Sequence, residues 1–159
     1  MSHTLPVRLI DPRAQRLGAG LSAITLGIAF ALNLPVLAGL VGLALAVSAL
    51  FGSQYFVFSR AWPRIRRTLR LAPPRDLEPE LGPRFAQAMG AVVIAFGVGL
   101  LAAGASLAGW VLVGAVVALQ TLLAATGYCL GCKLYGLHWL LPDLFDRFIL
   151  RRPGDAPAP

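Results

Sequence analysis

Residues 85–132 read FAQAMGAVVIAFGVGLLAAGASLAGWVLVGAVVALQTLLAATGYCLGC and contain no Asp, Glu, Lys or Arg. A second uncharged block covers residues 17–59, and the two blocks are 48 and 43 residues long. An α-helix needs about 20 apolar residues to cross a bilayer, so each block has room for two spans. The sequence therefore predicts an all-α integral membrane protein with four transmembrane helices.

The composition of the whole chain agrees with this fold class. Of its 159 residues 57% are hydrophobic, the mean hydropathy is +0.73, and 13% are charged. Soluble domains have about 25% charged residues, so an ordinary water-soluble enzyme is excluded. The net charge of +7 is typical of nucleic-acid binding in a soluble protein, but beside membrane spans it suits anionic lipid headgroups. We therefore expect the lipid bilayer as a partner and no nucleic acid.

Turn and capping signals divide the two blocks into helices. Asp11-Pro12 is a helix start, because Asp caps free amides and Pro fits the first helical position. Asn33-Leu34-Pro35 predicts a turn, and Gly104-Ala105-Ser106-Leu107-Ala108-Gly109 predicts a second one. The expected spans lie within a single membrane domain of residues 11–141 and cover about residues 17–32, 36–56, 85–103 and 110–126.

The positive charges predict the orientation. All 14 Lys and Arg residues fall in residues 8–16, 60–84 and 133–152, which four spans place on one side of the membrane. By the positive-inside rule both termini are cytoplasmic, and the protein is a multi-pass protein of the bacterial inner membrane. The first span has no convincing cleavage site and is expected to be retained. Interfacial helices are predicted in the basic cytoplasmic loop, residues 60–84, and in the cytoplasmic tail, residues 142–159.

A weak internal repeat divides the chain into two hairpins. Arg13-Ala14-Gln15-Arg16-Leu17-Gly18 resembles Arg84-Phe85-Ala86-Gln87-Ala88-Met89-Gly90, and each segment opens one hairpin. We expect the helices to pack through small residues, including Gly39, Gly42 and Gly97. Gln120 lies inside the last predicted span, and an amide at that depth is expected to form an interhelical hydrogen bond.

The only segment with reactive potential is the Cys-x-x-Cys motif of Cys129 and Cys132, at the cytoplasmic end of the fourth span. This spacing brings two sulfurs within reach of a disulfide or of a shared metal ion. A cytosolic pair is normally reduced, and its reactivity depends on thiolate formation. The C-terminal end of the preceding helix disfavours the thiolate. Two features offset this effect: Gly127 can end the helix before the cysteines, and Lys133 supplies an adjacent positive charge. We therefore assign Cys129 and Cys132 as an exchanging pair assisted by Lys133.

Two alternatives for this segment stay open. Cys129, Cys132 and His138 are candidate ligands of a metal ion, but zinc sites have three or four protein ligands, so a homo-oligomer would have to combine its pairs. Otherwise His138 is an interfacial residue beside Trp139, and the cysteines are inert. No cofactor is required by the sequence, and a metal ion is the alternative.

The chain resembles a known family at two of these segments. Arg84-Phe85-Ala86-Gln87 opens the second hairpin, and Gly127-Tyr128-Cys129-Leu130-Gly131-Cys132-Lys133-Leu134-Tyr135 closes it, as in the bacterial membrane family listed as domain of unknown function 4395. The resemblance covers about Asp11 to Leu141. It implies a four-helix inner-membrane protein of uncharacterised role. A weaker likeness is to two-helix bacterial membrane domains, some fused to sulfurtransferases, which have Pro where this chain has Leu130.

These observations lead to three hypotheses about function, and they leave open whether the protein is an enzyme. The leading one is thiol redox or sulfur relay, with a soluble thiol protein or sulfurtransferase docking on the basic cytoplasmic face. The second is a transporter or channel subunit for a small sulfur species or a metal ion. The third is a non-catalytic membrane scaffold.

Overall fold

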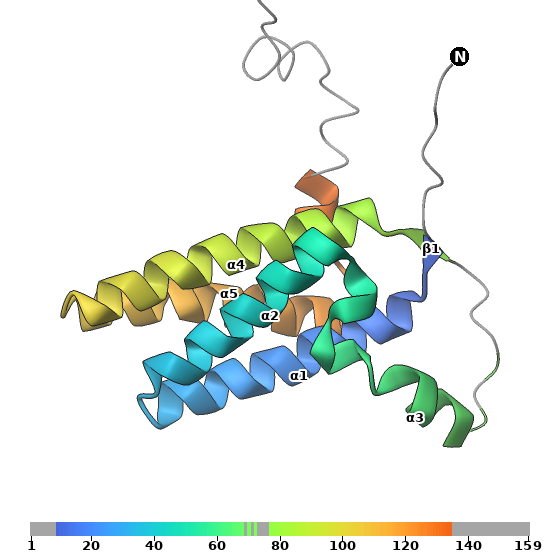
Figure 1. The fold of residues 1–159 in the computed structure, drawn as a ribbon, viewed down its shortest axis with the longest axis horizontal. Coiled ribbons are helices and arrows are strands. Elements are labelled where there is room, and N and C mark those ends of the chain that lie inside the picture. Colours follow the sequence, from blue (N-terminus) through green and yellow to red (C-terminus); the bar gives the residue numbers. More distant parts are fainter. Residues whose placement is uncertain (1–8, 69, 71, 73–76, 135–159) are drawn as a thin grey trace, which may run out of the picture.

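The computed structural model describes residues 9–68, 70, 72 and 77–134, and these are mostly helical (Figure 1). Four long helices run side by side: α1 (Pro12–Ala31), α2 (Pro35–Phe51), α4 (Leu81–Ala102) and α5 (Ser106–Thr126). The chain between α2 and α4 forms shorter elements: η1 (Ser53–Tyr55), η2 (Val57–Ser59) and α3 (Trp62–Thr68). Strands β1 (Leu9–Ile10) and β2 (Glu78–Pro79) pair antiparallel, so the starts of the two hairpins lie together.

The predicted start of α1 and the first predicted turn are confirmed. Oδ1 of Asp11 accepts a hydrogen bond from the backbone N–H of Arg13 at 2.9 Å, and Pro12 occupies the first helical position. After α1 the chain turns at Asn33, whose φ of 50° lies in the left-handed region that Asn tolerates better than most residues. Pro35 then begins α2.

The other helix boundaries differ from the predicted spans by a few residues. Helix α2 ends at Phe51 rather than at residue 56, because Gly52 takes a φ of 111° and breaks the helix. Helix α4 begins at Leu81, four residues before the predicted span. Helix α5 begins at Ser106, inside the segment that we had predicted to be a turn. The turn between α4 and α5 is shorter than predicted, because Gly104 alone takes a positive φ, 85°.

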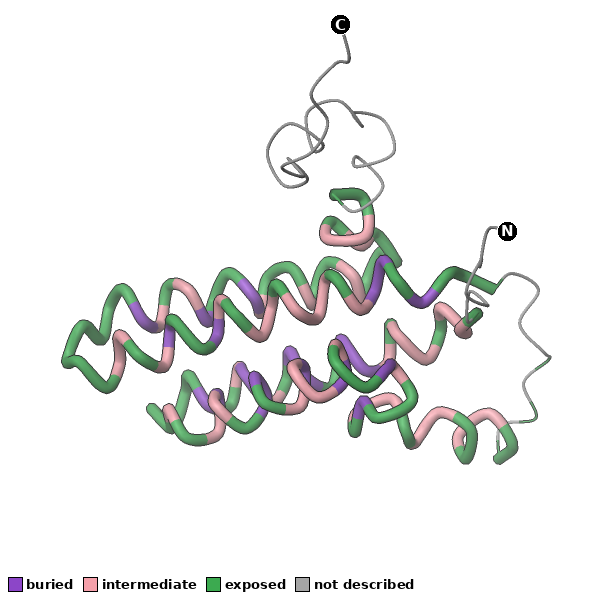
Figure 2. Tube along the Cα trace, turned by 45° about the horizontal axis from the view of Figure 1, so that its top comes forward, coloured by how far each residue is buried: buried purple, intermediate pink, exposed green. Residues whose placement is uncertain are grey.

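The first helix of each hairpin packs against the second helix of the other hairpin. Helix α1 contacts α5 much more than it contacts α2, and α2 makes its most extensive contacts with α4. The residues that face inward form one apolar core in the middle of the bundle (Figure 2). Its largest fully buried apolar side chains are Leu26 on α1, Val41 on α2, Ile94 on α4 and Val113 on α5. Each helix thus contributes to the same core.

The expectation that small residues allow close helix packing is confirmed at some positions only. A Cβ atom at Gly42 would lie 2.8 Å from Cγ2 of Ile94, and one at Gly97 would lie 3.1 Å from the carbonyl oxygen of Gly109. By contrast, a Cβ atom at Gly39 would have no neighbouring atom within 4 Å. Helices α2 and α4 therefore approach closely at Gly42, and α4 and α5 approach closely at Gly97.

The outward faces of the bundle are apolar. Helices α4 and α5 are long and apolar enough to cross a membrane, and only 22% and 17% of their most apolar stretches are buried. A soluble core helix would be mostly covered, whereas here large apolar side chains such as Phe96 and Leu107 are exposed. Helix α2 has 17 residues, and α1 contains Gln15 and Arg16, so neither meets the same length and composition criteria.

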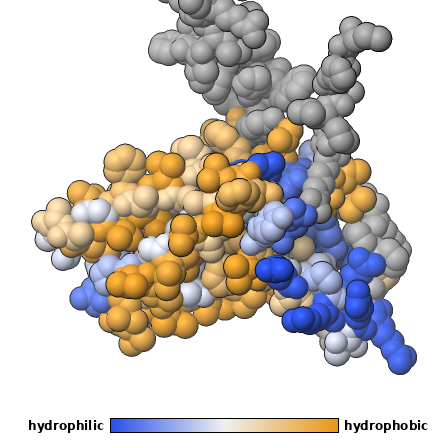
Figure 3. All heavy atoms as spheres, viewed as in Figure 1, coloured by the Kyte–Doolittle hydropathy of each residue, from blue (hydrophilic) through white to orange (hydrophobic). Residues whose placement is uncertain are grey.

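The charged side chains gather at one end of the bundle. Hydrophilic residues surround the end at which α3 lies, while the helices leading away from it are covered by hydrophobic residues (Figure 3). Arg16, Arg84 and the arginines of α3 all belong to this end. We call it the charged end. Among the residues that the structure describes, the opposite end, at the turns around Asn33 and Gly104, contains no charged residue.

The packing at Gly42 gives a test of the helix arrangement. Both Gly39→Ala and Gly42→Ala gain helix propensity, by about 1 kcal/mol, but only Gly42→Ala places a methyl group against Ile94. We expect Gly42→Ala to be less stable than Gly39→Ala by about 1–3 kcal/mol, the usual cost of overpacking. Unfolding in mild detergent measures this difference. Equal stability of the two variants would contradict the close approach of α2 and α4.

Candidate functional site

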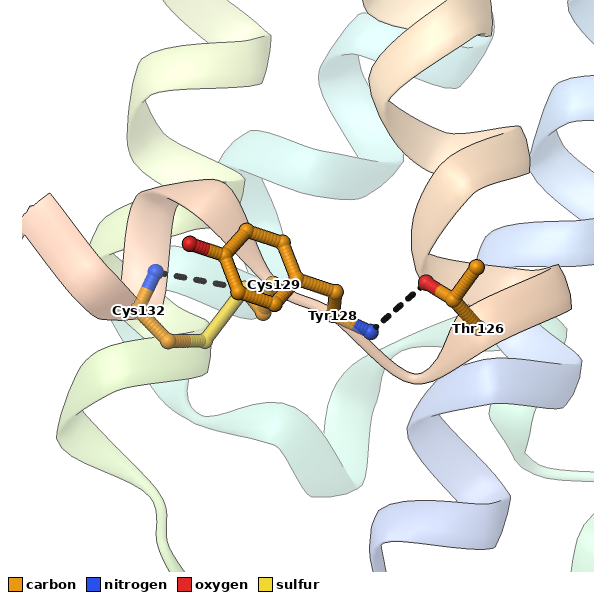
Figure 4. The surroundings of a disulfide bond; sticks show 4 residues. All are labelled: Thr126, Tyr128, Cys129 and Cys132. Carbon is orange, nitrogen blue, oxygen red and sulfur yellow. Dashed lines mark hydrogen bonds between the residues drawn. A yellow bond between two sulfur atoms is a disulfide. The ribbon is translucent and has the colours of Figure 1, made fainter.

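The Cys-x-x-Cys motif contains a disulfide bond in this structure. Cys129 and Cys132 are bonded through their sulfur atoms, and their Cα atoms lie 5.2 Å apart (Figure 4). Both residues are partly buried. We had expected a reduced pair, since cytosolic thiols are normally reduced, and the structure instead contains the oxidised form. The motif is therefore compatible in its geometry with the formation of an intramolecular disulfide.

The backbone around the motif confirms that Gly127 ends the helix before the cysteines. Helix α5 ends at Thr126, Gly127 takes a left-handed φ of 76°, and the chain becomes helical again at residues 130–134. The cysteines thus lie at the start of a new helical segment and not at the C-terminal end of α5. The N–H of Cys132 donates a hydrogen bond to Sγ of Cys129 at 3.2 Å (Figure 4). In the reduced protein a donor in this position favours the thiolate of Cys129, in addition to the positive charge that we expected from Lys133.

Gly131 lets this segment lie directly on the start of α4. A Cβ atom at Gly131 would lie 2.6 Å from Cβ of Ala86, so no larger residue fits between the motif and α4. On the other side of the contact, a Cβ atom at Gly82 would lie 3.7 Å from Sγ of Cys132. The disulfide is therefore held against the first turns of α4 by backbone contact.

Arg16 fixes the end of α5 just before the motif. Its guanidinium donates to the carbonyl oxygens of Ala124, at 3.2 Å from both Nε and Nη2, and of Ala125, at 2.9 Å. The last carbonyls of a helix lack intrahelical partners and carry partial negative charge, so an arginine stabilises them. The guanidinium also lies close to Gly127. Arg16 thus positions the turn that leads into the cysteines.

Arg84 plays the same part for the other hairpin. Its Nε donates to the carbonyl oxygen of Ala49 at 2.9 Å, and its Nη2 donates to that of Leu50 at 2.8 Å. Nearby, the carboxylate of Glu80 accepts hydrogen bonds from the N–H and the hydroxyl of Ser53 at 2.6 and 2.9 Å. The start of α4 therefore holds the end of α2 and the start of η1.

The remaining predicted site residues are placed as follows. Nζ of Lys133 lies over the ring of Tyr128, 6.0 Å from its centroid, so its described contact is with this ring. His138 lies outside the described residues. Within residues 9–134, as far as the structure describes them, no group of three metal-ligating side chains comes together. The metal alternative therefore has only Cys129 and Cys132 as described ligands.

One cavity adjoins the motif, and a second cavity lies beside the first. The first, of about 240 Å³, lies mainly between α4 and α5, and Cys129 forms part of its wall. The second, of about 400 Å³, opens among polar residues at the charged end, including Asp11 and Arg60. Gln15 and Gln87 line both cavities, so the two spaces share a wall.

The prediction that Gln120 forms an interhelical hydrogen bond is confirmed. Its Oε1 accepts a hydrogen bond from the hydroxyl of Ser22, across α1 and α5. A second bond of the same kind joins α2 to α4, where the hydroxyl of Ser48 donates to Oε1 of Gln87 at 2.6 Å. We had not predicted the second bond. Its signal in the sequence is an amide at the third position of an uncharged block, within Arg84-Phe85-Ala86-Gln87.

The two arginines provide matched variants for a test of the site geometry. Arg16→Gln removes the charged donor from the end of α5, where hydrogen bonds to charged groups contribute about 1.5–3 kcal/mol. We expect the amide of Gly127, which donates to the carbonyl of Leu123, to exchange faster with solvent. Arg84→Gln is the control, because it loosens the end of α2 instead. Hydrogen exchange with mass spectrometry measures both, and equal effects on the α5 end would contradict this role of Arg16.

Comparison with known proteins adds the family. No curated protein and no solved structure matches the chain. A family model described as a domain of unknown function matches residues 10–139, which include both hairpins and the Cys-x-x-Cys motif. Because this match covers most of the 159 residues, the chain belongs to the family Domain of unknown function (DUF4395).

Proposed function

We propose that the protein exchanges electrons between thiols and disulfides at the membrane through Cys129 and Cys132. The observation that carries the proposal is the disulfide at the start of a helical segment, with the N–H of Cys132 donating to Sγ of Cys129. A thiolate is the reactive form of cysteine, and donors near the sulfur favour it. Cys129 is then the cysteine that bonds to the partner.

The exchange balances without any further reagent. A thiolate of a partner protein attacks Sγ of Cys129, the bond between Cys129 and Cys132 breaks, and a mixed disulfide forms. The second thiol of the partner then attacks the partner sulfur that is bonded to Cys129. The mixed disulfide breaks, and Cys129 is released as a thiolate. The partner leaves oxidised, and Cys129 and Cys132 become thiols that hold two electrons and two protons. If the partner is a sulfurtransferase that carries a cysteine persulfide, the thiolate of the reduced Cys129 attacks the outer sulfur of that persulfide. The S–S bond of the partner breaks, its thiol leaves, and Cys129 becomes the persulfide.

We further propose that α1, α2, α4 and α5 all cross a bacterial inner membrane, with both termini and residues 60–84 on the cytoplasmic side. The support is the apolar outer surface of the bundle and the collection of arginines at one end. Positive residues beside spans are retained on the cytoplasmic side. The motif then faces the cytoplasm, where soluble thiol proteins can reach it.

The charged end supplies a docking surface for this partner. Helix α3 carries Arg64, Arg66 and Arg67 and is joined to the start of α1, because Nε1 of Trp62 donates to Oδ2 of Asp11 at 2.9 Å. Anionic lipid headgroups are attracted to such a surface, and so is an acidic face of a soluble thiol protein or sulfurtransferase. Strong salt dependence of partner binding is the expected consequence.

Single reporter cysteines test the orientation in a Cys129→Ser/Cys132→Ser background. Leu107→Cys lies at the uncharged end, where Leu107 is 82% exposed, and Arg60→Cys lies at the charged end. In intact spheroplasts we expect a membrane-impermeant maleimide to label Leu107→Cys only, and to label Arg60→Cys after the membrane is opened. Labelling of Arg60→Cys without opening the membrane would contradict the proposed orientation.

Single-cysteine variants test the chemistry. In the purified protein, Cys132→Ser leaves Cys129 free, and we expect it to be alkylated about tenfold faster than Cys132 in the Cys129→Ser variant, because its sulfur has the amide donor. The Cys132→Ser variant should also trap a mixed disulfide with an oxidised dithiol protein, visible on a non-reducing gel. A wild-type disulfide that no dithiol reduces would show the proposed exchange to be wrong.

A further inference from the structure

The cavity beside Cys129 is built from apolar side chains with a few polar ones. Its wall includes Val93 from α4, Leu119 and Leu123 from α5, and Phe56 from the segment after α2. Its volume of about 240 Å³ is slightly below the usual range for ligand pockets, which begins at about 300 Å³. It therefore has room for a single ring system rather than for a large ligand.

Two amide groups give this wall hydrogen-bond donors. Gln87 and Gln120 both line the cavity, and each uses its Oε1 to accept a bond from a serine on a neighbouring helix. These two bonds use only Oε1, so the Nε2 group of each glutamine keeps its capacity to donate. The two serines thus fix the amides so that their NH₂ groups remain as donors. A ligand of this cavity needs an apolar ring and oxygen atoms that accept hydrogen bonds.

The rim of the cavity faces the apolar outer surface of the bundle. Met89 on α4 and Leu119 on α5 both line the cavity and are 48% and 46% exposed. A ligand can enter between these side chains from the lipid. On the inner side, Gln15 and Gln87 also line the polar cavity at the charged end. The apolar space thus lies between a lipid-facing rim and the polar cavity at the charged end.

We infer that this cavity binds a lipid-soluble quinone, which reoxidises Cys129 and Cys132 after each exchange. The inference rests on the proposed function, because a dithiol formed by a partner must lose its electrons before the next turnover. A quinone meets each requirement of the cavity: an apolar ring, two acceptor oxygens and solubility in the membrane.

The step is balanced between the dithiol and the quinone. The S–H bonds of Cys129 and Cys132 break, and the bond between their sulfurs forms again. Two electrons and two protons pass to the quinone, and its two carbonyl oxygens become the hydroxyls of a hydroquinone. The amides of Gln87 and Gln120 donate to these oxygens, and their donation stabilises the negative charge that develops during electron transfer.

The test uses the full chain in phospholipid nanodiscs, with the disulfide first reduced and the reductant removed. Decylubiquinone is the probe, because its fully substituted ring does not form ring adducts with thiols. We expect its absorbance to fall as protein thiols disappear, with one quinone consumed per disulfide formed. Wild-type protein whose thiols persist in the presence of the quinone would overturn the inference.

A pair of variants on one exposed face of α5 connects the reaction to the cavity. Ala115 lines the cavity and Ala118 does not, and both are exposed alanines. We expect Ala115→Phe to slow quinone reduction about tenfold, which corresponds to about 1.4 kcal/mol of barrier, and Ala118→Phe to leave it unchanged. Met89→Trp, on the opposite rim, should act like Ala115→Phe. Equal rates in all three variants would overturn the assignment of this cavity.

Two further readouts separate this inference from the proposed function. Reduction of the disulfide by a dithiol should be the same in Ala115→Phe and in wild type, because the motif is unchanged. Normal exchange together with no oxidation by the quinone overturns the quinone site alone, whereas a disulfide inert to dithiols overturns both proposals.

In a Cys129→Ser/Cys132→Ser background, decylubiquinone should raise the Tm, and Ala115→Phe should abolish this shift. No shift in that background overturns the binding site.

Discussion

The arrangement of this protein depends on how the C-terminal ends of two helices are satisfied. Four backbone carbonyls at the end of a helix have no intrahelical partner, and at the ends of α2 and α5 an arginine from another hairpin donates to them. Arg16, from α1, holds the end of α5, and Arg84, from α4, holds the end of α2. The two interactions are reciprocal, so each hairpin is held by the first helix of the other. The same two helix pairs, α1 with α5 and α2 with α4, make the most extensive contacts in the bundle.

The candidate site follows from the same constraint. Because Arg16 fixes the last carbonyls of α5, the chain leaves that helix at Gly127 in a fixed direction and begins a new helical segment over the start of α4. Gly131 permits the close contact there, and Sγ of Cys129 accepts a hydrogen bond from the N–H of Cys132. The serine–glutamine bonds lie deeper in the bundle and join the same helix pairs. The cavity that we assign to a quinone lies between these bonds and the motif.

Local sequence signals predicted most helix boundaries, and their failures have local causes. Asp11-Pro12 and Asn33-Leu34-Pro35 act through backbone preferences of their own residues, and the structure agrees with both predictions. The second span was predicted to continue past Phe51, because Gly52 lies within a continuous uncharged run. Hydropathy cannot show that Gly52 takes a positive φ and ends the helix. The four spans and their orientation depend on a membrane and stay predictions, with α4 and α5 long and apolar enough to cross one.

The sequence by itself determined the apolar blocks, the positions of the charges and the presence of two cysteines at a reactive spacing. These are properties of residue type and order, and they predict the helices and a site near the end of α5. Only the tertiary structure decided that the Cys129 sulfur has an amide donor, that Arg16 caps α5, and that Gln87 and Gln120 line one cavity. Arg16 lies up to 109 positions from the carbonyls that it caps, so only the packing of one hairpin against the other brings them together. The other two relations depend on how the chain becomes helical again after Gly127 and on the contact of α4 with α5.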